Sequence, residues 1–168
     1  MITSTSDVVH TTKNDLPEAV RSDIIEVLGG LLADAVDLQL QGKQAHWNVK
    51  GPDFLALHQL FDKMVEQVQE YADLLAERIV QLGGIAAGTA RLVAAQTELE
   101  EYPATIARGD EHVQAVANAL ASFGGRVRPA IDRTQEIGDA VTADMLTEIT
   151  RGIDKLLWFV EAHGQAER

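Results

Sequence analysis

The stretch AHWNVKGPDFLALHQLFD, residues 45–62, joins two apolar helical patterns through a single break. Gly51 tolerates non-helical backbone and Pro52 disfavours helix at the residue before it, so a helix is expected to end near Lys50. On both sides of the break, apolar residues recur at spacings of three and four, as in amphipathic helices. The sequence therefore predicts two long helices, over about 16–50 and 52–82, joined by a tight connection.

Two further long helices are predicted over about 109–137 and 139–163, with Gly138 between them and a bend at Pro129. Residues 83–108 form a connection too long for a simple turn, in which RLVAAQTELEEY is expected to form a short helix. A crossover of this length suits neighbouring helices that run parallel. We therefore predict an all-α protein, a ferritin-like four-helix bundle whose long crossover contains a short extra helix.

The composition fits one bundle domain. The chain has 168 residues, 46% hydrophobic and 5% aromatic, which favours packed helices in one domain at 16–164, between a mobile tail at 1–15 and a short tail at 165–168. It has no cysteine, which excludes disulfides, cysteine-bound zinc and iron–sulfur clusters. We see no signal peptide and no apolar run near the ~20 residues of a membrane span. We expect a soluble, cytoplasmic protein without a membrane partner.

The net charge of the chain indicates whether it binds cations or DNA. A net charge of −12 attracts cations and repels a phosphate backbone, although acidity also serves solubility alone. The N-terminal tail carries Lys13 beside Asp7 and Asp15, and the C-terminal tail sets Arg168 against Glu167. Neither tail is a basic arm, so we expect DNA binding to be weak or absent.

Two pairs of polar residues share one face of the second helix. His58 and Asp62 are four residues apart, as are Asp73 and Glu77. At about 100° per residue, and with His58 at zero, the three carboxylates lie near 40°, 60° and 100°. At ~1.5 Å per residue, however, His58 and Glu77 are nearly 30 Å apart along the axis, so they cannot share one metal within one chain.

A two-fold axis brings the pairs together. If the helix pairs antiparallel with its own copy, centred between positions 67 and 68, His58 faces the partner's Glu77. Asp62 then faces the partner's Asp73. His46 can reach the same place across the tight connection. The predicted ligand set is His46, His58 and Asp62 from one chain with Asp73 and Glu77 from the other.

The chemistry of this set points to iron. Mixed nitrogen and oxygen ligands suit redox-active iron better than magnesium or calcium. The alternative is that these are ordinary structural histidines and solvated carboxylates, and spacing alone leaves it open. No histidine in the chain follows a glutamate by three residues, which argues against a di-iron core of the Glu-x-x-His type within one subunit.

At these residues the sequence resembles the Dps family of mini-ferritins, over about 16–164. The resemblance is carried by KQAHWNVKGPDFLALHQLFD, ADLLAERI, EYP at 101–103 and GDAVTADMLTEITRGIDKLLWFVEA at 138–162. It implies a shell of twelve subunits that oxidises Fe(II) at two-fold interfaces, usually with hydrogen peroxide in preference to dioxygen, and stores ferric mineral, which protects against oxidative damage. It implies that the five residues above are the ligands and that Trp47 packs by the site and intercepts stray oxidant.

The resemblance also implies a pore. In the family, the segment corresponding to QEIGDAVTAD, residues 135–144, lines a channel at three-fold axes, and here it carries Glu136, Asp139 and Asp144. Three copies of each carboxylate around one axis would concentrate cations. The alternative is that Asp139 and Asp144 offset the dipole at the start of the fourth helix.

The sequence alone therefore leaves three functions open. The first is an iron-storage ferroxidase. The second is a nucleoid-associated protein that compacts DNA and has a secondary metal site. The third is a structural helical oligomer with a vestigial or zinc-filled site.

Overall fold

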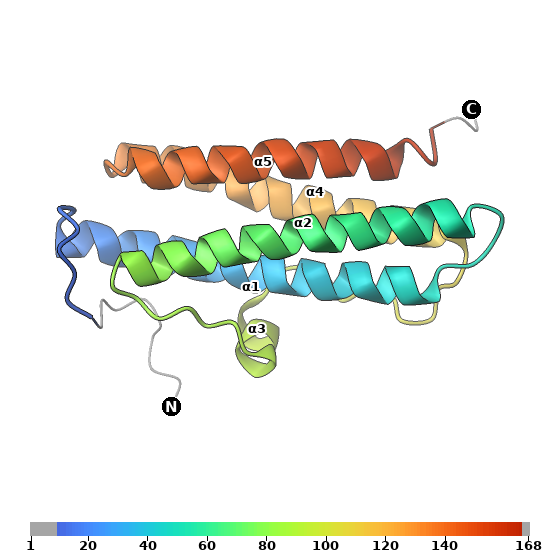
Figure 1. Cartoon of the computed structure of the whole chain (residues 1–168), viewed down its shortest axis with the longest axis horizontal. Helices are drawn as coiled ribbons and strands as arrows, with labels where there is room; N and C mark the ends of the chain where they lie inside the picture. The colour runs from blue at the N-terminus through green and yellow to red at the C-terminus, as the bar shows by residue number, and fades with distance from the viewer. Residues whose placement is uncertain (1–9, 166–168) are drawn as a thin grey trace.

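The computed structural model describes residues 10–165, in which five helices form a long bundle (Figure 1). The four long helices are α1 (Glu18–Asn48), α2 (Phe54–Gln81), α4 (Gly109–Glu136) and α5 (Ala140–Glu161), and the short α3 (Ala90–Gln96) lies in the crossover. The predicted all-α bundle and its extra helix are confirmed. The predictions for residues 1–9 and 166–168 fall outside the described part of the chain.

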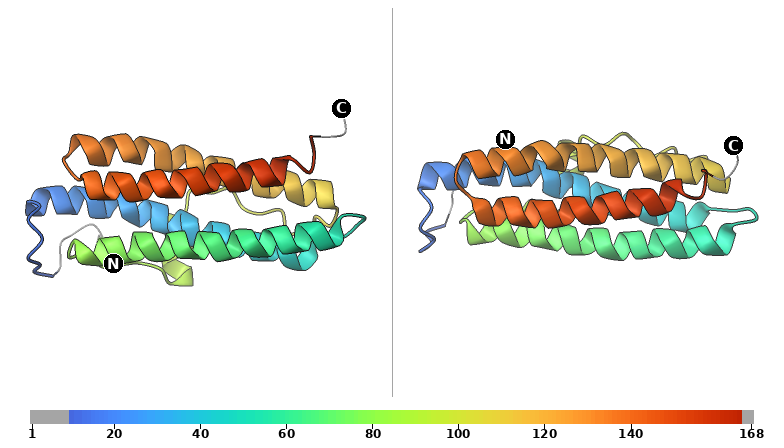
Figure 2. Two further views of the ribbon diagram at one scale, coloured as in Figure 1. Left: turned by 45° about the horizontal axis from the view of Figure 1, so that its top comes forward. Right: turned by 90° about the horizontal axis from the view of Figure 1, so that it is seen from above.

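The four long helices form two antiparallel hairpins, α1 with α2 and α4 with α5 (Figures 1 and 2). The hairpins pack through α1 against α4 and through α2 against α5. Helices α2 and α4 run in the same direction, so the crossover spans the length of the bundle. The prediction that it joins neighbouring helices is wrong, because α2 and α4 occupy diagonal corners of this packing.

The connections are set by glycine. Gly51 has a φ of 116°, a value that side chains with a Cβ rarely adopt, and it separates α1 from α2 as predicted. Gly138, with a φ of 96°, separates α4 from α5 in the same way. Pro129 lies inside α4. Both tight connections fold consecutive helices back on each other, which brings the end of α1 beside the start of α2.

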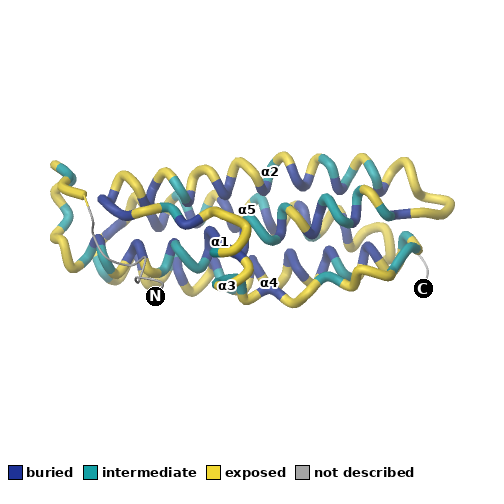
Figure 3. The backbone as a smooth tube through the Cα atoms, turned by 90° about the horizontal axis from the view of Figure 1, so that it is seen from below, coloured by how far each residue is buried: buried dark blue, intermediate teal, exposed yellow. Residues whose placement is uncertain are grey.

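The core is a continuous set of apolar side chains along the bundle axis, with exposed residues on the outer faces (Figure 3). Phe61, Phe123 and Leu28 are fully buried within it. Close contact between α2 and α5 depends on Gly152, because a Cβ there would lie 1.6 Å from the Tyr71 hydroxyl. None of the described helices is long and apolar enough to cross a membrane.

A buried ion pair anchors the crossover. The Asp34 carboxylate of α1 is fully buried and lies 2.6 Å from Nε of Arg126 on α4. The backbone N–H of Glu98 donates to the same carboxylate at 2.8 Å, and the Thr97 hydroxyl donates at 3.2 Å. Burial raises the pKa of Asp34 above its usual range, although Arg126 opposes the shift. The crossover is thus tied to both hairpins at mid-length.

Candidate metal centre

His46 and His58 stack face to face where α1 ends and α2 begins. Their ring centroids are 3.7 Å apart and the planes are inclined by 22°. Nδ1 of His46 lies 2.8 Å from the His58 carbonyl oxygen, and Nδ1 of His58 lies 2.9 Å from the His46 carbonyl oxygen. A carbonyl oxygen can only accept, so each Nδ1 carries a proton. When a ring is neutral, this tautomer leaves its Nε2 with the lone pair that a metal needs.

Asp62 lies one helical turn beyond His58. Its Oδ1 is 3.8 Å from Nδ1 of His46, and the Lys43 ammonium donates a hydrogen bond to the same oxygen. This hydrogen bond from Lys43 holds the pKa of Asp62 below its usual range, so the carboxylate is ionised at neutral pH. The structure thus brings three of the five predicted ligands together on one chain.

Lys43 was not predicted to take part. It is one turn before His46 on α1, and that spacing of three residues was the signal available in the sequence. Its side chain and that of Asp62 are 33% and 41% exposed, so this is a partly solvated pair that a metal can disturb.

Asp73 and Glu77 are exposed on α2 and lie well away from the histidines of the same chain. At ~1.5 Å per residue, Asp73 is over 20 Å along the helix from His58. Among the described residues of one chain, no group of three histidine and carboxylate side chains converges on a single ion. Each subunit therefore presents two separate parts of the predicted ligand set.

Trp47, predicted to pack by the site, is 67% exposed in the single chain. It follows His46 at the last turn of α1. No partner surface within the described chain covers most of its indole ring.

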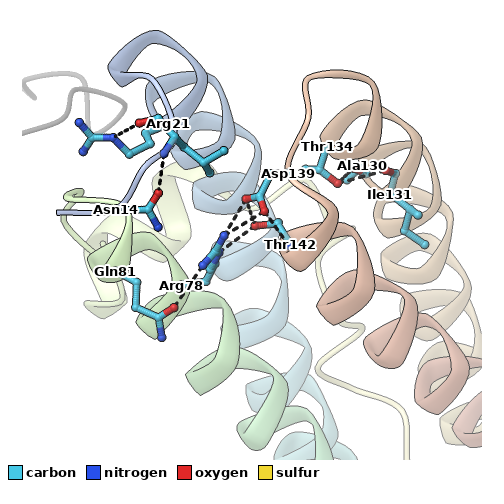
Figure 4. A network of polar contacts seen from close by, with 10 residues as sticks. Asn14, Arg21, Arg78, Gln81, Ala130, Ile131, Thr134, Asp139 and Thr142 are labelled. Carbon is cyan, nitrogen blue, oxygen red and sulfur yellow. Dashed lines mark hydrogen bonds and ion pairs between the residues drawn. The ribbon is translucent and has the colours of Figure 1, made fainter. Parts of the chain in front are cut away.

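The residue after Glu77 has a structural role that the sequence did not reveal. Arg78 points into the bundle, where Nη2 donates to both oxygens of Asp139 at 3.0 and 2.8 Å (Figure 4). Its Nε donates to the Thr142 hydroxyl at 2.8 Å. This bidentate pair joins α2 to the start of α5 and fixes the rotation of α2, and hence the outward direction of Glu77.

The three predicted pore residues differ in their surroundings. Glu136 and Asp144 are exposed. Asp139 is 2% exposed and caps α5 by accepting from the backbone N–H of Thr142 at 3.0 Å. Burial raises the pKa of Asp139, but hydrogen bonds from Thr142 and Arg78 outweigh it and hold the pKa below its usual range. The capping alternative describes Asp139, whose carboxylate is already occupied, so we keep Glu136 and Asp144 as pore candidates.

Comparison with known proteins agrees with this fold. A model of the ferritin-like domain matches residues 25–168. The DNA protection during starvation protein of Agrobacterium fabrum is 45% identical over 156 residues, which cover 93% of this chain and 96% of that relative. The corresponding protein of Mycolicibacterium smegmatis is 32% identical over 148 residues, 88% of this chain and 80% of the relative.

Solved structures give the same result. DpsC from Streptomyces coelicolor matches with a TM-score of 0.93 and 30% identity, covering 100% of this chain and 98% of that one. Dps from Microbacterium arborescens in its high iron form matches with a TM-score of 0.82 and 34% identity, covering 92% and 97%. The chain therefore belongs to the ferritin-like family and, within it, to the Dps proteins, as the sequence resemblance predicted.

Proposed function

We propose that this protein is a mini-ferritin that oxidises Fe(II) at sites shared between two subunits and stores the ferric product inside a hollow homo-oligomer, a dodecamer in the Dps pattern. The observation that carries the proposal is the His46–His58 pair, whose two Nδ1–H groups are both tied to carbonyl oxygens. Two imidazoles oriented in this way, beside the ionised Asp62, form half of a metal site.

The other half is proposed to come from the partner's Asp73 and Glu77. At about 100° per residue they lie on the same side of α2 as the partly buried His58 and Asp62, and an antiparallel copy would place each beside its counterpart. Fe(II) is the substrate. Hydrogen peroxide, the proposed oxidant, takes one electron from each of two Fe(II) ions, its O–O bond breaks, and with two protons it yields two water molecules. The residues of this chain bind the two Fe(II) ions and hold the ligands of the two subunits opposite one another.

The surroundings support cation uptake. The chain carries a net charge of −12, so a shell of identical subunits attracts Fe(II) from dilute solution. Removing Fe(II) and peroxide together limits oxidative damage. The cytoplasm is the proposed location. We propose no resident zinc.

The test uses two inactive variants, His58→Ala and Glu77→Ala. In a mixed dimer one site carries both changes and the other carries neither, so co-assembled variants should regain part of the Fe(II) oxidation rate that each lacks alone. His163→Ala, which changes an exposed histidine beyond α5, serves as the matched control and should keep the full rate. No recovery in subunits shown to have mixed would refute a shared site.

DNA compaction is the second candidate, favoured by the name of the relatives, DNA protection during starvation protein. The charge of this chain opposes it. A gel-shift titration of plasmid DNA at ~50 mM salt, where phosphate contacts are strongest, separates the two. Retardation at neutral pH without divalent metal would establish DNA binding.

A further inference from the structure

The crossover carries a tyrosine whose hydroxyl contacts a buried base. Tyr102, the middle residue of the EYP motif, follows α3 along the crossover, and His112 lies in the first turn of α4. The Tyr102 hydroxyl lies 2.6 Å from Nδ1 of His112, and the two rings are nearly parallel, with an interplanar angle of 21°. His112 is fully buried. The proposed function, as stated above, uses neither residue.

The protonation states of this pair follow from its surroundings. Burial raises the pKa of the Tyr102 hydroxyl well above its usual range, so the phenol keeps its proton and donates it to Nδ1. Burial also lowers the pKa of His112, so the ring is neutral at neutral pH and Nδ1 offers a lone pair. The hydrogen bond therefore joins a neutral phenol to a neutral imidazole, an arrangement in which a proton can move from oxygen to nitrogen.

The other nitrogen of the imidazole lies where a positive charge can be stabilised. Nε2 of His112 is buried and makes no hydrogen bond with the described residues. A buried donor without a partner costs stability, so packing alone does not explain it. The backbone of Asn48 and Ile106 favours the protonated ring, and so does the negative charge of Glu111. An imidazolium formed here is thus stabilised by groups that are already in place.

The pair lies against the end of α1 that carries the candidate ligands. Asn48, whose backbone acts on His112, is the last residue of α1 and lies ~3 Å along the helix axis from His46. The segment before α4 is fixed at the same place, because the backbone N–H of Lys50 donates to the Ala107 carbonyl oxygen at 2.9 Å. An electron that leaves the phenol therefore has a short path through packed protein to the half-site.

The other tyrosine of the chain provides a contrast. Tyr71 lies between α2 and α5, and its hydroxyl accepts a hydrogen bond from the Gln67 amide. An amide N–H is a donor and cannot take up a phenolic proton. Of the two tyrosines, both in the described part of the chain, Tyr102 is the one joined to a base by a hydrogen bond.

We propose that Tyr102 is a one-electron donor to the oxidation of Fe(II) by peroxide and that His112 holds its proton while the electron is away. The inference rests on the proposed function, and it concerns a site at which a single Fe(II) is bound when peroxide arrives. One Fe(II) supplies one electron, whereas breaking the O–O bond without releasing a hydroxyl radical requires two. Tyr102 supplies the second.

The electrons and protons balance in two steps. In the first, the O–O bond of hydrogen peroxide breaks as Fe(II) and Tyr102 give one electron each, which yields Fe(III), two hydroxide ions and a neutral phenoxyl radical. The phenolic proton moves to Nδ1 of His112. In the second, another Fe(II) reduces the radical and becomes Fe(III), and His112 returns the proton to the phenolic oxygen. Two Fe(II) are again oxidised per peroxide, although they are bound one after the other.

Spin trapping tests the electron donor. The assembled protein is loaded with one Fe(II) per site without oxygen and mixed with an equal amount of hydrogen peroxide and a hydroxyl-radical trap. Tyr102→Phe should raise the yield of the hydroxyl adduct several-fold, because the second electron is lost. Tyr71→Phe is the matched control and should give the wild-type yield. Equal yields from the wild type and Tyr102→Phe would overturn the proposal.

Electron paramagnetic resonance of rapidly frozen samples tests the role of His112. The wild type and Tyr71→Phe should show a phenoxyl signal under the same conditions, and Tyr102→Phe should not. In His112→Gln the amide oxygen can still accept from the Tyr102 hydroxyl but cannot take up its proton, so the signal should weaken several-fold. If the pair is only structural, both variants lower the melting temperature, and the wild type shows no phenoxyl signal.

A photochemical experiment separates this inference from the proposed function, because it needs no iron. Light-excited tris(bipyridine)ruthenium(II) with persulfate removes single electrons from the variant Trp47→Phe/Trp158→Phe, in which no tryptophan competes with the tyrosines. Phenoxyl absorbance should form several-fold faster than after the further change His112→Gln. Such a His112-dependent rate in a protein that oxidises no Fe(II) would support the redox pair and refute the ferroxidase. Oxidation of Fe(II) without a Tyr102 radical in either experiment would overturn the pair and leave the ferroxidase intact.

Discussion

At the scale of the residue, Lys43 decides how readily the half-site accepts a cation. Its ammonium group donates to Asp62, a proposed ligand, so an arriving metal competes with it for the same oxygen. Lys43→Met keeps much of the chain length and removes the charge. We expect the dissociation constant for a non-oxidising probe such as Co(II) to fall about twofold to fivefold, since a partly exposed ion pair is weak and its loss frees the carboxylate for the metal.

Isothermal titration of the assembled protein measures this change. Lys50→Met, which removes an exposed charge at the same end of the bundle, is the control and should leave the constant nearly unaltered. Weaker Co(II) binding by Lys43→Met would mean that the lysine orients Asp62 for the metal instead of competing with it.

Asp139 differs from Asp62, because its charged carboxylate is paired with Arg78 inside the bundle and stabilises the fold. In Asp139→Asn the capping oxygen remains, but the buried Arg78 loses its counter-charge. Removing one member of such a pair costs roughly 3–5 kcal/mol of unfolding free energy. The pKa of Asp139 is lowered in the folded state, so its contribution is present above the unfolded value of about 3.9 and is lost as pH falls through the folded value.

Denaturant unfolding at several pH values tests both statements. The gap between wild type and Asp139→Asn should be largest near neutral pH and should narrow below about pH 4. A gap that stays constant down to pH 2 would show that the lost stability comes from packing and not from the ionised carboxylate.

At the scale of the element, Gly152 sets the distance between α2 and α5. A Cβ there would meet the Tyr71 hydroxyl at 1.6 Å and Nε2 of Gln67 at 2.8 Å, closer than any real contact. Gly152→Ala should therefore destabilise the bundle by roughly 1–3 kcal/mol, as overpacking does elsewhere. Tyr71→Phe in the same chain should restore part of the loss, because it removes the nearest atom.

The control is Gly125→Ala on α4, where a Cβ meets nothing within 4 Å. That change should raise stability by about 0.5–1 kcal/mol through helix propensity alone. Thermal unfolding of the three variants compares them, and equal melting temperatures for the two alanine variants would contradict the steric account.

The elements were largely predictable, and the polar contacts between them were not. The period of three and four, with the breaks at Gly51 and Gly138, was sufficient to place four helices, because these signals are local. The crossover is held against Asp34, which pairs with Arg126 on a helix distant in sequence. The buried position of Arg78 could not be predicted, because nothing near it in sequence shows that Asp139 lies opposite. Long-range pairing leaves no trace in a single sequence.

At the scale of the whole molecule, the residues of the candidate site also fall into those predictable from local sequence and those that depend on distant contacts. His46, His58 and Asp62 were predictable as a group because a tight turn and one helical turn join them. The placement of Asp73 and Glu77 beside them stays a prediction from symmetry, since one chain does not bring them to the histidines. The role of Lys43 needed the actual rotation of α1 against α2.

Iron entry belongs to the scale of the assembled shell. Asp144 is exposed near the start of α5, unlike Asp139 five residues earlier, which is buried in its ion pair. If three copies of this segment meet, three Asp144 carboxylates concentrate Fe(II) at the opening.

Asp144→Asn should slow iron uptake several-fold at low ionic strength and less at high ionic strength, because salt screens exposed charges. Its unfolding free energy should change by about 0.5 kcal/mol or less, in contrast to Asp139→Asn. Stopped-flow absorbance of ferric product, recorded at two salt concentrations, measures the uptake. If Asp144→Asn takes up iron at the wild-type rate while Glu136→Gln does not, the entry path runs past the end of α4; if neither variant is slowed, iron enters at another junction between subunits.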